Sequence, residues 1–135
     1  MTPEGLIVQE SRHGPAETAE RLVAAVKARG LAVMAEIDHA AGAASAGMEL
    51  RPTKVILFGN PRGGTPLMAA AQSAGIDLPL KALVWQDAEG RTWLGYNDPS
   101  WIAARHGVAA AAAGPVKAMT DMLAAVALAA AGDGA

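Results

Sequence analysis

The stretch FGNPRGGTP, residues 58–66, combines residue types that can hold a negatively charged group without using a charged side chain. It follows the apolar run KVILFGN at 54–60 and precedes a second apolar run, which places it in a strand-to-helix connection. Glycines let the backbone approach a guest closely, and free N–H groups at the start of a helix favour an anion. We therefore predict a small-ligand site, suited to a phosphate or a carboxylate, at Gly59, Asn60, Gly63, Gly64 and Thr65.

The same stretch lacks the spacing of the known nucleotide-binding motifs. The lysine of a P-loop is missing, and the glycines do not match the dinucleotide fingerprint. A tight turn followed by a helix cap is the structural alternative to a ligand site.

Two histidines and one aspartate are the candidates for acid/base catalysis, since an imidazole titrates near neutral pH in its unperturbed state. His39 follows Asp38 at the end of a predicted strand, where consecutive side chains point to opposite faces, so these two are not a ready dyad. His106 and Asp98 are the other candidates. The alternatives are surface or structural histidines and, for Asp98, a helix N-cap.

Tyr96 and Asn97, together with His39, complete the predicted ligand-binding set. The pocket is expected where the 59–65 connection meets His39 and the 96–106 segment. No histidine pair has the spacing of a zinc-binding helix, so no metal site is predicted. No cofactor is predicted either, and His39 is where a metal or a haem would bind if the protein held one.

Composition excludes several classes of protein. The chain has 135 residues, a formal net charge of -2 and no cysteine, which rules out disulfides and thiolate chemistry. A slightly acidic chain has no basic field to gather nucleic acid phosphates. Hydrophobic residues make up 52%, and no uninterrupted apolar run is long enough to cross a membrane. We expect one soluble, cytoplasmic domain over residues 1–135 that binds neither nucleic acid nor membrane.

Turn and cap residues divide the chain into predicted elements. Gly90 is expected to take a positive φ in the turn of a hairpin, Thr65 to cap a helix that begins at Pro66 and ends at Gly75, and Asp98 to cap another. The predicted strands are 5–11, 31–38, 54–60 and the two arms of the hairpin at 81–97. The predicted helices are 15–29, 66–75, 99–106 and one that starts at Pro115, with 40–47 open to either a loose helix or a loop.

This order of elements predicts an α+β fold in which one mixed or antiparallel sheet carries helices on one face, as a two-layer sandwich. The last helix is apolar nearly all round from 123 to 131. Because such a helix is usually buried on more than one side, residues 115–131 are predicted to form a homodimer interface. A frayed, alanine-rich tail is the alternative.

Several short segments resemble the domain of unknown function 302, a widespread prokaryotic family, over about residues 18–128. The segments that carry the resemblance are Ile37-Asp38-His39, Leu50-Arg51-Pro52, Phe58-Gly59-Asn60-Pro61, Asp77-Leu78-Pro79, Tyr96-Asn97-Asp98-Pro99 and Arg105-His106. The resemblance implies a small α/β fold that is often paired as a dimer. It implies no agreed activity, cofactor or substrate.

Three hypotheses about function follow. The first is a dimeric domain that binds or senses a small ligand, for example an anion. The second is a small hydrolase, lyase or isomerase in which His39 or His106 moves a proton while the glycine-rich connection holds an oxyanion or phosphate. The third is a structural dimerisation module, for which the apolar last helix is the evidence.

Overall fold

A single five-stranded sheet organises the computed structural model, which describes residues 2–132. Its strands are β1 (Leu6–Ser11), β2 (Ala32–Asp38), β3 (Thr53–Gly59), β4 (Leu80–Gln86) and β5 (Thr92–Asn97). The helices are α1 (Pro15–Ala28), α2 (His39–Ser45), α3 (Pro61–Ala70), α4 (Pro99–Arg105) and α5 (Ala113–Ala131), and η1 (Gln72–Asp77) is a short 3-10 helix.

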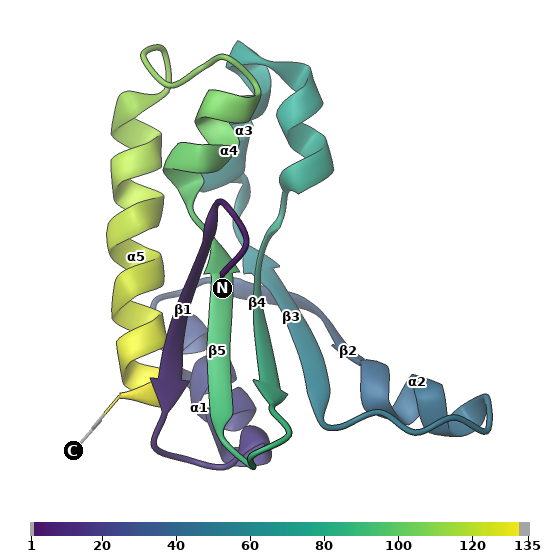
Figure 1. The fold of residues 1–135 in the computed structure, drawn as a ribbon. Coiled ribbons are helices and arrows are strands. Elements are labelled where there is room, and N and C mark those ends of the chain that lie inside the picture. The colour runs from purple at the N-terminus through teal and green to yellow at the C-terminus, as the bar shows by residue number, and fades with distance from the viewer. Residues whose placement is uncertain (1, 133–135) are drawn as a thin grey trace.

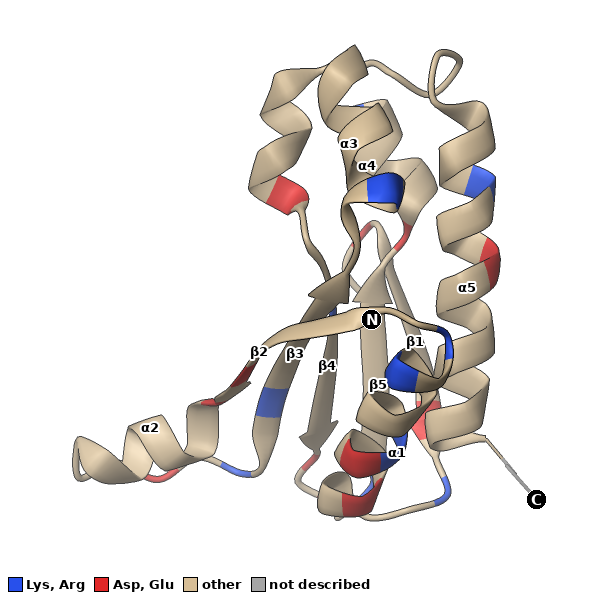
Figure 2. Cartoon of the chain, turned by 180° about the vertical axis from the view of Figure 1, so that it is seen from behind, with Lys and Arg blue, Asp and Glu red and all other residues tan. Residues whose placement is uncertain are grey.

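The strands lie in the order β1-β5-β4-β3-β2, and every neighbouring pair is antiparallel. Helices α1 and α5 pack together against one face of this sheet (Figures 1 and 2). Helices α3 and α4 and the 3-10 helix η1 gather at one end of it (Figure 1). The predicted α+β fold with helices on one face is therefore confirmed, and the sheet is antiparallel rather than mixed.

The core forms where the two long helices meet the covered face of the sheet. Leu22 and Val26 of α1 are fully buried against Ile56 and Phe58 of β3. Alternate residues of a strand point to opposite faces, so Ile56 and Phe58 share the covered face. From α5, the predicted stripe of Val116, Met119, Leu123 and Val126 is buried in the same core.

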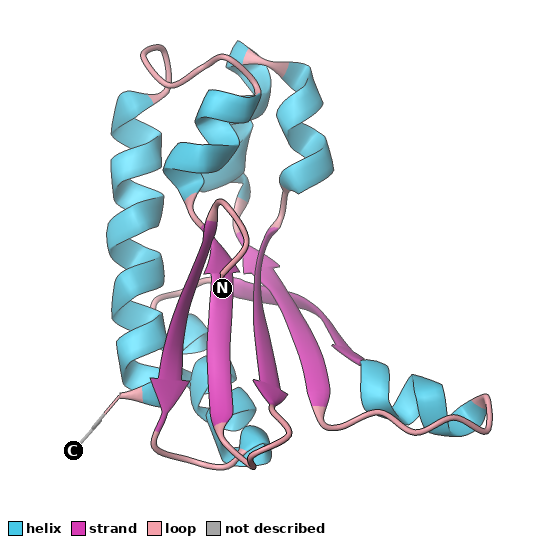
Figure 3. Ribbon diagram, in the orientation of Figure 1, coloured by secondary structure: helices cyan, strands magenta, loops and turns pink. Residues whose placement is uncertain are grey.

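On the opposite face of the sheet, no helix from residues 2–132 covers strands β1, β5 and β4 (Figures 1 and 3). Apolar side chains alternate onto it and stay only partly buried; on the three inner strands they include Val55, Leu57, Leu83, Trp85 and Trp93. Trp85 lies against Gly95, where an added Cβ would approach its ring to 3.1 Å. Acidic and basic residues are interspersed on the helical side (Figure 2), in keeping with the small net charge.

Most predicted boundaries agree with the structure to within two residues. Gly30 ends α1 with a φ of 75°, and Gly90 has a φ of 83° in the β4–β5 turn. Asp98 caps α4 by accepting a hydrogen bond of 2.9 Å from the backbone N–H of Ser100. The segment predicted as helix or loop at 40–47 forms helix α2, which projects from the sheet (Figure 1).

The predicted start of α3 at Thr65 and Pro66 is wrong. Asn60 is the N-cap, Pro61 is the first helical residue, and Pro66 lies inside the helix. Asn60-Pro61 and Thr65-Pro66 have equivalent sequence signals, since each pairs a capping residue with a proline suited to the first helical position. In the structure the helix begins at the earlier pair, where Asn60 directly follows β3, has an extended backbone with φ −151° and ψ 161°, and caps the helix by accepting from the Gly63 N–H. The predicted continuous helix to Gly75 is also interrupted, because Ala71 is extended and η1 follows it.

Helix α5 has 19 residues and an 18-residue window with a mean hydropathy of 1.2, so its length and composition would allow it to cross a bilayer. In this structure a third of that window is buried inside the chain. A helix that packs one face into a core meets the same criterion, which is therefore weak evidence for a membrane span. The outer side of α5 carries Lys117, Asp121 and Leu128, of which Leu128 is 57% exposed.

Candidate functional site

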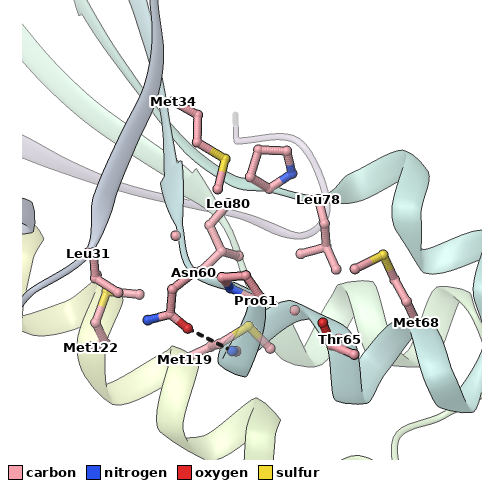
Figure 4. Close-up of a pocket in the computed structure, with 14 residues that line it drawn as sticks. Leu31, Met34, Asn60, Pro61, Thr65, Met68, Leu78, Leu80, Met119 and Met122 are labelled. Carbon is pink, nitrogen blue, oxygen red and sulfur yellow. Dashed lines mark hydrogen bonds between the residues drawn. The ribbon is translucent and has the colours of Figure 1, made fainter.

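A cavity of about 320 Å³ lies at the end of the sheet where β3 ends and β4 begins (Figure 4). We call it the methionine pocket, after four of its lining residues. It is lined by Met34, Met68, Met119 and Met122, by Leu31, Leu78, Pro79 and Leu80, and by Gly59, Asn60, Pro61, Gly63, Gly64 and Thr65. Its volume is at the lower end of the range seen for small-molecule sites, and such sites are mostly apolar.

Strand register brings these distant segments together. Ala32 pairs with Gly59, and Phe58 pairs with Leu80, so the start of β2, the end of β3 and the start of β4 are neighbours. Helix α3 leaves the sheet at this point, and α5 contributes Met119 and Met122 from the helical layer. Five of the eight predicted ligand-binding residues, Gly59, Asn60, Gly63, Gly64 and Thr65, therefore line one pocket.

Met34 reaches the pocket because of an irregularity in the edge strand β2. The pairing of β2 with β3 shifts register between Val33 and Ala35, so Met34 is the extra residue of a β-bulge. A bulge re-aims a side chain relative to the regular alternation of the strand. Met34 is 53% exposed at the rim of the pocket, where its flexible thioether can adjust to what binds.

Asn60 is the polar centre of the pocket wall. Its side-chain oxygen Oδ1 accepts a hydrogen bond of 3.0 Å from the Gly63 N–H. Its amide nitrogen Nδ2 points away from that bond, toward the side of Leu31 and Met122 (Figure 4). Within residues 2–132 this nitrogen has no hydrogen-bond partner, so it can donate to an acceptor atom in the pocket.

The predicted row of free amides is not present at the glycines. The Gly63 N–H is bonded to Asn60 Oδ1 and also lies 3.2 Å from the Asn60 carbonyl, and the Gly64 N–H lies 3.4 Å from that same carbonyl. The cause is the early start of α3, which turns both glycines into first-turn residues with internal partners. An anion at this place would depend on the Asn60 side chain rather than on a cradle of glycine amides.

The pocket wall is otherwise unsuited to a bare ion. None of the described residues that line it is charged, and burying an ion without an opposite charge costs several kcal/mol. Methionines, leucines and prolines instead offer a deformable apolar surface. The arrangement suits a ligand with an apolar body and one hydrogen-bond acceptor.

His39, Tyr96 and Asn97 lie outside the methionine pocket. His39 is the exposed first residue of α2, which begins at the far end of β2 from the pocket. Tyr96 is buried on the covered face of the sheet, where burial, with a contribution from the Asp98 charge, raises the pKa of its phenol. Its hydroxyl therefore stays protonated at neutral pH. Asn97 ends β5 and pairs with Leu6.

His106 occupies a separate place, at the C-terminus of α4. Its Nε2 lies 2.6 Å from Asp77 Oδ2, and its Nδ1 lies 2.8 Å from Ser73 Oγ. Arg105 also binds Asp77, through Nη1 at 2.9 and 3.0 Å. His39 makes no contact with this cluster, because α2 and α4 are held at different ends of the sheet (Figure 1). The enzyme hypothesis that joins these histidines to the glycine-rich segment gains no support from this geometry.

His39, the residue at which a metal or a haem would bind, is exposed at the start of α2. Among residues 2–132, no group of three or more His, Asp or Glu side chains gathers in a way that could bind a metal ion. Asp38, its neighbour, uses its carboxylate to cap α2 by accepting from the Ala41 N–H.

Sequence reasoning did not identify the methionines or Ser73 as site residues. A usable signal for the pocket existed, because four of the six methionines of the chain line it and methionine is common at adaptable binding surfaces. Met119 and Met122 are three residues apart on α5, but Met34 and Met68 lie far from them in the sequence, and the fold brings them together. For Ser73, no local motif links it to His106.

A protein-family comparison decides where the chain belongs. The family described as "Domain of unknown function DUF302" matches residues 7–126. The chain belongs to the DUF302 family. The resemblance inferred from the short segments is thereby confirmed. The crystal structure of an uncharacterised conserved DUF302 protein from Bacillus stearothermophilus has the same fold, with a TM-score of 0.84 at 21% identity over 95% of this chain and 99% of that one.

Relatives with curated names are also similar to this DUF302 chain. It is 46% identical over 129 residues to "Fluoride-specific ion channel FluC 1" of Brucella suis biovar 1 and to "Fluoride-specific ion channel FluC 2" of Brucella melitensis biotype 1. The match covers 96% of this chain but 51% and 48% of those two proteins. The chain thus spans about half the length of the curated relatives it matches.

Proposed function

We propose that this DUF302 chain is a binding or sensing domain for a small ligand that has an apolar body and one acceptor group, such as a carboxylate that stays in contact with water beside the partly buried Asn60. The observation that carries the proposal is the methionine pocket, with its apolar wall and the free Nδ2 of Asn60 (Figure 4). The apolar body would bury itself against methionines 34, 68, 119 and 122, and the acceptor would face Asn60.

Asn60 allows a test that separates ligand binding from stability. In Asn60→Asp, the carboxylate can still accept from the Gly63 N–H, since Asp and Asn cap helices about equally well. The variant loses the Nδ2 donor and gains a negative charge inside the pocket. We expect it to unfold at the same urea concentration as the native chain but to bind octanoate at least ~10-fold more weakly, about 1.4 kcal/mol.

Calorimetric titration with octanoate and with octanol measures this difference. Octanol has the same apolar tail without the charge, so its affinity should change much less than that of octanoate in Asn60→Asp. Equal octanoate affinities for the two proteins would show that Asn60 does not face the ligand. If neither compound binds the native chain, the proposed ligand class is wrong.

The named activity of the Brucella relatives does not match the chemistry of this pocket. Fluoride is a small, strongly hydrated anion, and none of the described lining residues carries a positive charge to replace its water. We infer that a fluoride channel of this kind would use the DUF302 chain as an accessory or regulatory domain rather than as the ion pathway.

We expect that sodium fluoride, compared with a sodium chloride control, leaves the octanoate affinity unchanged. Competition between fluoride and octanoate would contradict this inference.

Homodimerisation is the second function that we propose. The uncovered face of the sheet is a better candidate for the dimer interface than helix α5. The inner side of α5 is already used by the core, whereas the open face leaves Leu57, Leu83 and Trp85 only partly buried. Two such faces can pack together with the sheets about 10 Å apart.

We expect light scattering to give a dimer mass for the native chain and a monomer mass for Leu57→Lys. Leu128→Lys on α5 should keep the dimer mass. The reverse pattern would restore α5 as the interface.

A further inference from the structure

Ser73, His106 and Asp77 form a continuous chain of hydrogen bonds where η1 packs beside the end of α4. Ser73 Oγ lies 2.8 Å from His106 Nδ1, and His106 Nε2 lies 2.6 Å from Asp77 Oδ2. None of the three lines the methionine pocket. The cluster is therefore separate from the ligand site proposed above.

The partners fix where the protons are. The Asp77 carboxylate already accepts from the Arg105 guanidinium at 2.9 and 3.0 Å, and an ionised carboxylate has no proton to donate. His106 must then carry its proton on Nε2 and donate it to Asp77. In the neutral ring this leaves a lone pair on Nδ1, so the Ser73 hydroxyl is the donor of the 2.8 Å bond.

An activated nucleophile needs a shielded base and an exposed attacking atom, and the three linked side chains differ in burial in this way. The side chains of His106 and Asp77 are 7% and 12% exposed, so the base is held in place and shielded. Ser73 is exposed, and a reagent from solvent can reach its oxygen. A hydroxyl bonded to a base that is itself oriented by a carboxylate is the general arrangement for nucleophilic catalysis.

We propose that Ser73 is a nucleophile toward the acyl group of activated esters, with His106 as its base and Asp77 as the residue that positions His106. In the first step, Ser73 Oγ attacks the acyl carbon, its proton passes to His106 Nδ1, the ester C–O bond breaks, and the leaving oxygen takes that proton. In the second step, water attacks the acyl-serine, again giving a proton to Nδ1, and Ser73 Oγ recovers the proton as it leaves. The sum is ester plus water giving acid plus alcohol.

The absence of cysteine from the sequence provides a clean test. Ser73→Cys places one thiol against His106, and Ser45→Cys places one at an exposed serine whose hydroxyl, among residues 2–132, bonds to the Gly42 carbonyl and not to a base. A neighbouring base increases the thiolate fraction of a cysteine. We expect iodoacetamide to alkylate the Ser73→Cys protein about 10-fold faster than the Ser45→Cys protein at neutral pH. Equal rates would show that His106 does not activate position 73.

The native serine is tested with p-nitrophenyl acetate. We expect peptide mapping to find the acetyl group on Ser73, and we expect p-nitrophenol release to fall about 100-fold in Ser73→Ala and in His106→Gln but not in Ser45→Ala. Acetylation spread over lysines and other serines, with release unchanged in Ser73→Ala, would overturn the proposal. A purely structural cluster would change the unfolding midpoint of these variants and leave the release rate unaltered.

Discussion

Replacing Leu123 by glutamate is expected to unfold most of the protein rather than to separate two subunits. Leu123 is 1% exposed in the core between α5, α1 and the sheet, and a carboxylate there would have neither water nor a partner. The free energy of unfolding should fall by more than about 4 kcal/mol, a large part of the total stability of a domain of this size. Urea denaturation followed by tryptophan fluorescence measures the change.

Leu128→Glu is the matched control on the same helix. Leu128 is 57% exposed, so its replacement should change the free energy of unfolding by no more than about 0.5 kcal/mol. If Leu123→Glu keeps the native urea midpoint and alters only the molecular mass, the packing of α5 described above is wrong.

Filling the methionine pocket from Gly64 is expected to abolish ligand binding while α3 stays folded. A Cβ at Gly64 would lie 3.5 Å from Leu78 Cδ1 and 3.6 Å from Met68 Cε, which are ordinary contacts with two residues of the pocket wall. Gly64→Phe should therefore extend its ring into the cavity and weaken octanoate binding at least ~100-fold, about 2.7 kcal/mol. Calorimetry measures the affinity, and circular dichroism checks the helix content.

Gly64→Ala is the control for that substitution. Its single methyl group fits without a clash, and alanine is favoured over glycine inside a helix by about 1 kcal/mol. The alanine variant should be as stable as the native chain or more so, and it should still bind octanoate. Native affinity in Gly64→Phe would place the ligand elsewhere.

Local signals in the sequence were sufficient for most of the fold. Pro15, Gly30, Gly90 and Asp98 mark element boundaries through backbone rules that act over a few residues, and the structure confirms each of them. The start of α3 could not be chosen in this way, because Asn60-Pro61 and Thr65-Pro66 carry the same local signal. In the structure Asn60 follows directly on β3 and is the residue that caps the helix.

The site depended on contacts that local patterns do not encode. The glycine-rich segment does line the methionine pocket, yet the chemistry it suggested was the binding of an anion by free glycine amides. The apolar wall comes from residues as far apart as Met34 and Met122, joined by strand register, a β-bulge and the packing of α5. His106 and Asp77 are likewise 29 positions apart and meet only through the packing of α4 on η1.

The most direct measurement of the central claim is an NMR titration of the native chain, labelled at its methionine methyl groups, with octanoate. Met34, Met68, Met119 and Met122 line the pocket, whereas Met48 is 66% exposed in the segment after α2 and serves as an internal reference. The proposal predicts that the four pocket signals shift together with one saturable affinity while the Met48 signal stays in place. The proposal would be contradicted if only the Met48 signal shifted. It would also be contradicted if none of the four pocket methionines showed a saturable shift.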